Sequence, residues 1–370
     1  MERMTRAALA STYRERQHLH DRIDLEGLPI EDRVLSEVRH QIGMQSQAPL
    51  PPYTALWTRI TGFEPLAASA LVRSGALVRV VCMRSTIHLV RAEDAWSLRS
   101  LTAPVLEREF TSAIARRVPG VDVAAVVDRA AGVLDGADLP ARDLGRDLAS
   151  RFDGSAPADL VNLVRCHLPL VQRPPRGEWG ATGGVVYARL DQHVPVHEVE
   201  PLEEVRSLVL RYLGAYGPAT PADFAQWSGL RGAREVFASL GDAVVPVEVE
   251  GRTLVDRADA VRDGGERKAP TARLLAEFDA AVLSHADRAR ILPDPSVIAS
   301  PNGLIPATFL VDGAVAGTWS LSIADGEAHA SLHPAGTLSQ RVQSALRREL
   351  RSLARTLHGA RLTDTTLSPG

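Results

Sequence analysis

The sequence predicts an α+β protein with three tandem winged-helix units, followed by a small β-barrel or sheet and a C-terminal helix. The main observation is a repeated pattern: helical segments followed by paired strand-like runs occur three times before residue 262. After a charged linker near residues 257–270, the composition shifts to short strand-like runs. A chain of 370 residues is long enough for several such units.

The first unit is expected over residues 1–100, and its helical segments show apolar residues at helical spacing. Its elements are expected as helices over residues 30–42, 52–60 and 64–74 and strands over residues 76–82 and 85–90. Helices followed by a two-stranded ribbon are typical of a winged helix.

The second unit is expected over residues 101–200, with a Pro, Gly and Arg-rich wing between strands at 170–172 and 185–190. The third unit, over residues 201–262, has the clearest signals. Thr220 is expected to cap a helix that begins at Pro221, and Gly229 is expected to end it. Its other elements are expected as helices over residues 203–216 and 231–240 and a hairpin over residues 244–249 and 253–255.

The small barrel or sheet is expected over residues 270–335, with Asp312-Gly313 as a hairpin turn. Its strands are expected at residues 297–299, 307–311 and 314–320. Residues 336–370 should supply the C-terminal helix and tail, with leucines on one face. The opposite face carries Arg348, Arg351 and Arg355. These arginines form either an ordinary solvated face or a stripe that contacts phosphates.

Composition excludes several classes of function. The net charge of −3 leaves room only for a local nucleic-acid surface. The two cysteines lie in apolar runs, and no signal peptide or membrane span is present, so we expect a cytoplasmic monomer. Lys268 is the only lysine, which argues against Schiff-base catalysis. Pro195 separates His193 from His197, so we expect no metal site there. The sequence has no nucleotide-binding glycine loop, so we expect no cofactor.

The segment Gln45-Ser46-Gln47 sets two glutamines on either side of a small residue, before a Pro-rich turn. Amides are neither strong acids nor strong bases near neutral pH, so in a reaction they would orient water or stabilise developing charge. Alternatively, they brace the turn by bonding local backbone groups. The residues alone leave both interpretations open.

Several motifs resemble the AlkZ/YcaQ group of bacterial DNA glycosylases, which are built on tandem winged helices. The resemblance covers nearly the whole chain. It rests on Gln45-Ser46-Gln47, residues 83–90, Pro175-Arg176-Gly177 with Trp179, Tyr216-Gly217-Pro218, residues 283–290, Leu310-Val311-Asp312-Gly313 and Gly317-Thr318-Trp319.

The resemblance implies that Gln45 and Gln47 are catalytic, in the double-glutamine form of the AlkZ branch associated with self-resistance to DNA-alkylating natural products. The implied enzyme is a monofunctional glycosylase acting on double-stranded DNA that carries bulky or cationic alkylpurines. Its substrates would be N7-alkylguanine, N3-alkyladenine and interstrand cross-links, and its product an abasic site. A base alkylated at these positions is cationic and leaves neutral without a general acid, so two amide carbonyls could suffice.

Further site residues are expected, some within these motifs and some outside them. We expect a lesion pocket that includes His88, Tyr53 and Trp57, although a histidine among apolar neighbours is usually a core residue. DNA contacts are expected from Arg84, Arg176, His285, Arg288, Arg290, Arg348, Arg351 and Arg355. The alternatives are a non-catalytic winged-helix transcriptional regulator and a structural adaptor.

Overall fold

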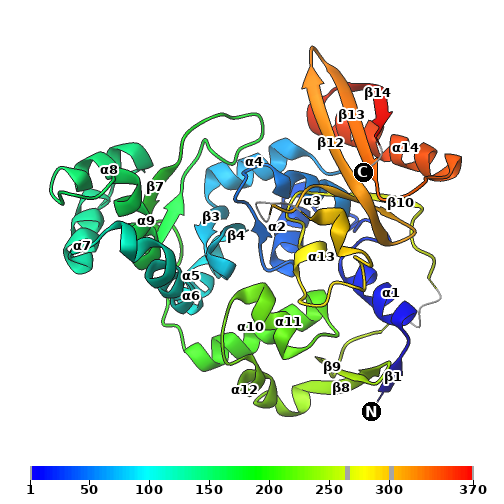
Figure 1. Cartoon of the computed structure of the whole chain (residues 1–370), viewed down its shortest axis with the longest axis horizontal. Coiled ribbons are helices and arrows are strands. Elements are labelled where there is room, and N and C mark those ends of the chain that lie inside the picture. The colour runs from blue at the N-terminus through cyan, green and yellow to red at the C-terminus, as the bar shows by residue number, and fades with distance from the viewer. Residues whose placement is uncertain (1, 263–266, 300–303, 369–370) are drawn as a thin grey trace.

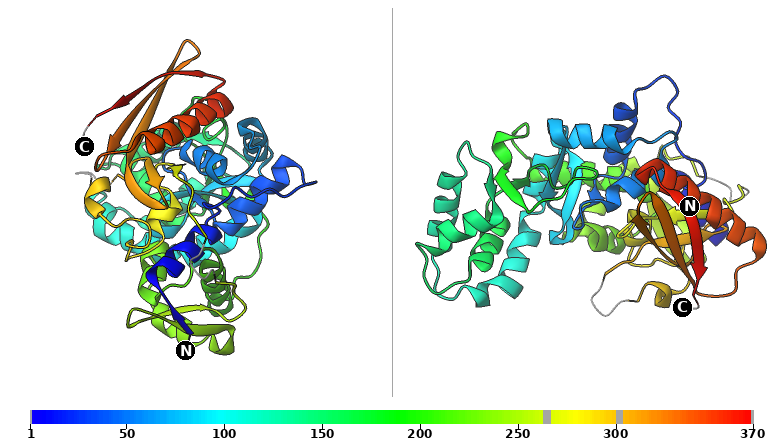
Figure 2. Two further views of the ribbon diagram at one scale, coloured as in Figure 1. Left: turned by 90° about the vertical axis from the view of Figure 1, so that its right-hand side faces the viewer. Right: turned by 90° about the horizontal axis from the view of Figure 1, so that it is seen from above.

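The structure is a computed structural model that describes residues 2–262, 267–299 and 304–368. It is a mixed α+β protein with three separate sheets, of three, five and six strands (Figure 1). The lobe of helices α7–α9 and the five-stranded sheet lie at opposite ends of the long axis (Figures 1 and 2). The elements that hold the glutamines lie between these two ends.

The first group of elements follows the predicted order closely. It contains α2 (Ile30–His40), β2 (Met44–Gln45), α3 (Pro51–Arg59), α4 (Pro65–Ser74), β3 (Leu77–Val81) and β4 (Ile87–Arg91). Both α3 and α4 begin with proline, whose fixed φ suits the first turn of a helix. Gly75 ends α4 with a φ of 82°, a conformation that favours glycine. The three helices and two strands predicted here are confirmed.

The sheet of the first group continues into the second group. Its strand order is β2-β4-β3-β6-β7-β5, with β5 (Leu139–Pro140), β6 (Leu170–Gln172) and β7 (Val186–Arg189) from the second group. The junction is an antiparallel pairing of β3 with β6, in which Val80 lies opposite Val171. The two expected wings are therefore one six-stranded sheet, with β2 at its edge.

Helices of the second group form the lobe at the far end of this sheet (Figure 1). They are α5 (Ala92–Leu101), α6 (Ala103–Glu109), α7 (Val123–Val133), α8 (Ala141–Ala149) and α9 (Pro157–His167). Asp122 caps α7 by accepting a hydrogen bond from the Ala125 amide. Leu106, Leu144, Leu148, Leu160 and Leu163 are fully buried between these helices, so the lobe has its own hydrophobic core.

The third group contains a helix that begins at the predicted cap. Its elements are α10 (Pro201–Tyr216), α11 (Pro221–Ser228), α12 (Ala233–Ala238), β8 (Val244–Val249) and β9 (Arg252–Arg257). Thr220 and Asp223 form a reciprocal capping box, and Gly229 ends α11 with a φ of 80°. The structure adds β1 (Glu2–Met4), which pairs in parallel with β8, and α1 (Arg6–Arg16), which contacts α10. Residues that we assigned to the first unit thus complete the third.

The C-terminal region is an open five-stranded sheet in the order β10-β11-β12-β13-β14. The strands are β10 (Ala272–Leu275), β11 (Thr308–Val311), β12 (Ala314–Ala324), β13 (Glu327–Pro334) and β14 (Arg361–Leu367). The long β12–β13 hairpin projects from the body of the molecule (Figures 1 and 2). Helix α14 (Gln340–His358) is capped by the Ser339 side chain and packs against β10 and β14.

Two predictions for this region are corrected. The expected strand at residues 297–299 is instead a 3-10 turn (Pro295–Ile298), because Pro295 and the cap from Asp294 favour a turn there. The predicted domain boundary at residue 336 is also wrong. It separated the C-terminal helix and tail from the sheet, whereas β14, in the tail, pairs with β13 of that sheet. Within the described ranges, no helix is long and apolar enough to cross a membrane.

Candidate active site

Gln45 lies on the edge strand of the six-stranded sheet, and Gln47 follows two residues later, beyond the end of β2. In β2, Gln45 lies opposite His88 of β4. Gln47 is exposed and Gln45 half-buried, whereas Ser46 is fully buried. The segment therefore presents two amides and anchors the residue between them.

Ser46 is held from beneath by Arg79, a buried residue of β3. The Arg79 guanidinium donates hydrogen bonds to Oγ of Ser46 at 3.1 Å and to its carbonyl at 2.7 Å. Gly177 makes room for this side chain, since a Cβ there would lie 2.6 Å from Cδ of Arg79. Burial and the nearby charge of Arg176 lower the pKa of Arg79 to about 10, so Arg79 is still charged at neutral pH. A cation beneath Ser46 thus fixes the backbone between the glutamines.

Both amide oxygens are already bonded to groups that can only donate. Gln45 Oε1 accepts from Nη2 of Arg84 at 2.8 Å, and Gln47 Oε1 accepts from the Ile87 amide at 3.1 Å. Because the donors have no acceptor atoms, each side chain must turn its oxygen inward. Among the described residues, neither amide nitrogen has a hydrogen-bond partner. This corrects our expectation of two free carbonyls: the site presents N–H donors, with one acceptor position left on each oxygen.

Arg84 connects this strand to the third group of elements. It lies in the turn η1 (Met83–Ser85) with a φ of 52°, and its Nη1 donates to the carbonyl of Trp227 at the end of α11. Burial is the main cause that lowers its pKa to about 10. Our prediction made Arg84 a DNA contact, whereas the structure shows it orienting Gln45.

His88 is buried beside Gln45, and its Nδ1 bonds the carbonyl of Thr86 at 3.1 Å. Burial, assisted by the charge of Arg84, lowers its pKa to about 3. His88 is therefore neutral at physiological pH. It borders the glutamines as predicted, but it cannot serve as a cationic acid there.

Tyr53 and Trp57, which we expected in a lesion pocket, are core residues of α3. The Tyr53 hydroxyl donates to the Gly177 carbonyl at 2.7 Å, and its ring lies 5.0 Å from the Trp179 ring. Trp57 is 4% exposed and lies beneath the guanidinium of Arg22, 4.6 Å away. Both prefer this environment because a large aromatic surface is stabilised by burial, so the prediction of a pocket role is corrected.

Two predicted DNA contacts on the 283–290 segment are also structural. His285 is 2% exposed, and its ring nitrogens bond Oγ of Ser284 and the Tyr216 carbonyl. Arg290 donates to the Pro218 carbonyl at 2.8 Å and lies over the ring of Tyr13. These groups brace α10 and α1, and burial lowers the pKa values of both. His285 is therefore not available to a phosphate, whereas Arg290 is half-buried and also lines a cavity of about 370 Å³.

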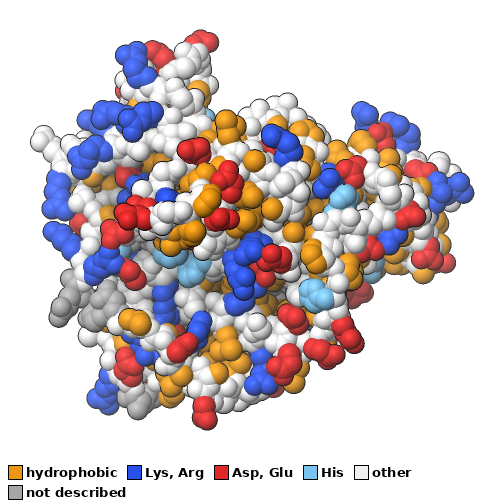
Figure 3. All heavy atoms as spheres, turned by 180° about the vertical axis from the view of Figure 1, so that it is seen from behind, with side chains coloured by type: hydrophobic (Ala, Val, Ile, Leu, Met, Phe, Trp, Pro, Cys, Tyr) orange, Lys and Arg blue, Asp and Glu red, His pale blue; other side chains and the backbone are white. Residues whose placement is uncertain are grey.

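The remaining predicted DNA contacts are more accessible. Arg176 is partly exposed in the loop between β6 and β7 and donates to the Gly183 carbonyl at 3.2 Å. Arg288 is partly exposed and has no ion-pair partner in the described part of the chain. Arg348, Arg351 and Arg355 are exposed on the outer face of α14, also without an ion-pair partner among the described residues. Figure 3 shows Lys and Arg side chains, in blue, gathered on the side of the molecule where α14 lies.

A groove of about 420 Å³ begins directly after Gln47. Its lining combines the Pro-rich turn with two indole rings and the end of α14. The residues that line it include Ala48, Pro49, Leu50, Trp179, Glu277, Trp319 and His358. A mostly apolar groove beside a polar site is a common arrangement for ligand binding.

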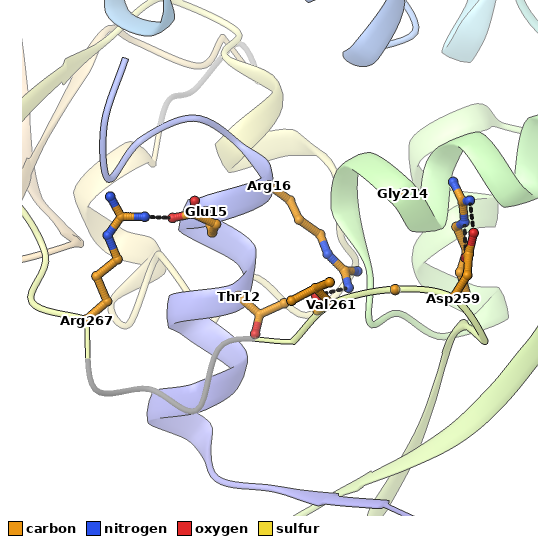
Figure 4. A pocket seen from close by; sticks show the side chains of 9 residues that line it. Thr12, Glu15, Arg16, Gly214, Asp259, Val261 and Arg267 are labelled. Carbon is orange, nitrogen blue, oxygen red and sulfur yellow. Dashed lines mark hydrogen bonds and ion pairs between the residues drawn. The ribbon is translucent and has the colours of Figure 1, made fainter. Parts of the chain in front are cut away.

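Another cavity, of about 590 Å³, lies between α1, α10 and the segment after β9 (Figure 4). Its arginines are neutralised within the protein: Arg16 pairs with Asp256, Arg257 with Asp259 and Arg267 with Glu15. None of the predicted site residues lines it. Within the described residues no cluster of three or more His, Cys, Asp or Glu side chains could hold a metal ion.

Two residues near Gln45 were not predicted. Glu277 and Phe278 follow β10 and line a small hollow that Gln45 also lines. Phe278 has a φ of 53°, which is strained for an aromatic residue. The sequence offered one signal, because the polar residues Glu277 and Asp279 directly follow the apolar strand Ala272–Leu275.

Comparison with known proteins supplies the family. The model of the family described as "DNA glycosylase AlkZ-like" matches residues 38–356, most of the chain. The chain belongs to this family. As an AlkZ-like protein it is a DNA glycosylase, an enzyme that hydrolyses N-glycosidic bonds and acts in DNA repair. It is therefore not the non-catalytic regulator that the sequence left open.

Two relatives come from Streptomyces sahachiroi. One, the "Interstrand DNA cross-link repair glycosylase", is 29% identical over 280 residues, which cover 66% of this chain and 71% of the relative. The other is the solved structure of the S. sahachiroi DNA glycosylase AlkZ. It superposes with a TM-score of 0.76 and 22% identity over 100% of both chains, so the AlkZ fold is shared.

Proposed function

We propose that this AlkZ-like glycosylase removes alkylpurines that are already cationic, such as N7-alkylguanine and N3-alkyladenine, and leaves an abasic site. Gln45 and Gln47 are its proposed catalytic residues. They would orient the hydrolytic water and the deoxyribose while the base departs with the electron pair of its glycosidic bond. That electron pair cancels the positive charge of the alkylated ring.

The observation that carries this proposal is that the side chains of Gln45, Gln47 and His88 hold no acidic proton at neutral pH. The amides of Gln45 and Gln47 cannot donate a full proton, and His88, with a pKa of about 3, is deprotonated at neutral pH. A normal purine needs protonation to leave easily, whereas a cationic alkylpurine does not. The site is therefore suited to bases that leave without an acid.

The proposed substrates also include bulky lesions. The S. sahachiroi relative is named for the repair of interstrand cross-links, and we propose the same class of bulky lesion for this chain. The 420 Å³ groove beside Gln47 would receive the part of the adduct that extends from the base. A role in self-resistance to a DNA-alkylating natural product would follow.

We propose that the three groups of helices and strands act as winged-helix units and bind DNA together with the arginines of α14. Phosphate contacts by arginine release counterions, so affinity should fall steeply with salt. The enzyme would be monofunctional. Lys268, the only lysine, lies in an exposed segment, whereas Schiff-base catalysis needs a desolvated amine.

The test is single-turnover excision on a duplex that carries one N7-alkylguanine. The wild-type enzyme should release free alkylguanine and leave an alkali-labile site. Gln45→Ala and Gln47→Ala should each slow release about 100-fold, the effect of removing one preorganised hydrogen-bonding group. DNA affinity should change less than twofold, because neither amide is expected to contact phosphates.

Gln340→Ala is a matched control, since Gln340 is an exposed glutamine in the first turn of α14. This variant should excise at the wild-type rate. Normal turnover by both Gln45→Ala and Gln47→Ala would refute the catalytic assignment. Absence of release by the wild-type enzyme from N7-alkylguanine, N3-alkyladenine and cross-linked duplexes would refute the substrate class.

A further inference from the structure

The hollow beside Gln45 has room for about one water molecule. Its volume is about 10 Å³, near the lower limit for holding a single water. Besides Gln45, its lining includes Glu277, Phe278 and Arg59. A water in such a place needs two or more polar partners, and this lining supplies them.

Two polar groups of the lining have unused hydrogen-bonding capacity. Nε2 of Gln45 has no partner among the described residues, since Arg84 occupies the oxygen of that amide. Glu277 is exposed at its outer side and has no ion-pair partner in the described part of the chain. The guanidinium of Arg59 is already engaged, because two of its nitrogens bond Asp279 and its Nε faces Glu37 at 3.6 Å. The hollow therefore offers one donor and one carboxylate to a water.

The backbone holds Glu277 firmly at this place. Two residues later, Asp279 receives two hydrogen bonds from Arg59, of 2.9 and 2.6 Å, and caps α13 (Ala280–Leu283) through the Ala281 amide. Between them, Phe278 has its strained φ of 53°, and its amide donates to the Ile305 carbonyl. A strained residue persists only where the surroundings determine it, and such residues cluster at functional sites.

An unpaired carboxylate at this position also opposes DNA binding. Glu277 lines both the water-sized hollow and the 420 Å³ groove, so it lies on the surface where we place the lesion. A negative charge there repels phosphates and contributes nothing to the grip on DNA. A role for the Glu277 carboxylate in the chemical step would explain why an acidic residue lies on this surface.

We propose that Glu277 is the general base of this glycosylase and that the hydrolytic water sits between Glu277 and Gln45. The inference rests on the proposed function. The bond between C1′ and the purine nitrogen breaks, and its electron pair neutralises the cationic base. The water oxygen bonds C1′, and one water proton passes to the Glu277 carboxylate and then to solvent. The products are a neutral free base and an abasic sugar.

The experiment compares Glu277→Gln with the wild-type enzyme on an N7-alkylguanine duplex. We expect single-turnover excision to fall about 100-fold, within the range for a general base. DNA affinity should stay equal or rise, because the substitution removes a repulsive charge. The matched control is Glu198→Gln, at an exposed glutamate without an ion-pair partner among the described residues, and it should excise at the wild-type rate.

Chemical rescue separates a proton-transfer role from a structural one. Sodium formate should restore at least a tenth of the missing rate to Glu277→Ala, whereas sodium chloride at equal concentration should not. Wild-type release with an equally fast Glu277→Gln would overturn the inference and leave the proposed function intact. A joint loss of rate, DNA affinity and thermal stability, without rescue by formate, would overturn it as well. If the wild-type enzyme releases no alkylated base, both proposals fall together.

Discussion

Arg84 donates a 2.8 Å hydrogen bond to Oε1 of Gln45 and reaches the carbonyl of Trp227 with its other terminal nitrogen. One guanidinium thus joins the edge strand of the six-stranded sheet to the end of α11. Because guanidinium groups only donate, this interaction decides which end of the Gln45 amide faces the site. The orientation of a proposed catalytic residue therefore depends on a group of elements far along the chain.

This relationship predicts the effect of Arg84→Lys. A lysine keeps the positive charge, but its compact ammonium lacks the planar fork that spans both acceptors. We expect single-turnover excision to fall about 10-fold while DNA affinity changes less than twofold, measured by product release and by fluorescence anisotropy. Arg91→Lys, at an arginine paired with Glu93 at the end of β4, should have little effect. Equal rates for the two variants would show that Arg84 does not orient Gln45.

The pKa of His88 predicts a pH dependence of stability. In the folded protein His88 takes up its proton only near pH 3, whereas in the unfolded chain it does so near pH 6.5. The unfolded state therefore binds more protons between these values, and stability falls as the pH is lowered from 6.5 towards 3. At about 1.4 kcal/mol per unit, His88 alone should remove about 2 kcal/mol between pH 7 and pH 5.

Urea unfolding at the two pH values measures this effect. The asparagine of His88→Asn can still donate to the Thr86 carbonyl but does not titrate in this range. Between pH 7 and pH 5, the free energy of unfolding of this variant should therefore fall by about 2 kcal/mol less than that of the wild-type protein. Other buried histidines, including His285, shift in the same direction and remain in both proteins. Identical losses of stability in variant and wild type would show that His88 is not the responsible group.

Breaking the buried ion pair between Arg59 and Asp279 should greatly lower the free energy of unfolding. Both side chains are almost fully buried, and Asp279→Asn would leave the Arg59 charge without this partner. Removing one member of a buried pair costs about 3–5 kcal/mol. Since Glu37 lies 3.6 Å from Arg59 and can compensate in part, we expect the lower end of that range in urea unfolding.

The comparison for this variant is Asp259→Asn, which breaks an exposed pair with Arg257. Exposed pairs contribute little, so the free energy of unfolding should barely change. A loss of the same size in both variants would mean that burial does not govern the strength of these pairs.

The arginines of α14 predict a change in salt dependence. Removing one arginine that binds a phosphate should reduce the slope of log affinity against log salt by about 0.9. If Arg348, Arg351 and Arg355 all bind phosphates, replacing the three with glutamine should lower the slope by about 2 to 3. Arg361→Gln, at an exposed arginine paired with Glu327, is the control. An unchanged slope in the triple variant would identify α14 as an ordinary solvated helix.

Local signals in the sequence were sufficient for much of the fold. The prolines that begin α3 and α4 and the Thr220 cap of α11 act within one turn of the chain, so they could be read without tertiary information. The pairings of β3 with β6 and of β1 with β8 join residues far apart in sequence. Such pairings leave no local pattern, which explains why the merged sheet was not predicted.

The candidate site, too, combines features that local sequence predicts with features that depend on distant residues. The sequence showed that Gln45 and Gln47 flank a small residue before a Pro-rich turn, but it did not predict the short strand β2. The inward-facing oxygens of the two amides depend on η1, where Arg84 and Ser85 both have positive φ. His285 and Arg290 looked accessible because polar residues surround them in sequence. Both instead contact Tyr13, which α1 brings from the other end of the chain, and His285 is buried there.

The pairing of β3 with β6 also makes two groups of elements inseparable. A fragment ending before Leu170 would leave the backbone edge of β3 that pairs with β6 open to solvent and to other chains. Such an edge promotes aggregation, so neither group should be obtainable alone as a well-behaved domain. The strand that carries the glutamines and the distant helical lobe are accordingly expected to be inherited, engineered and unfolded as one piece.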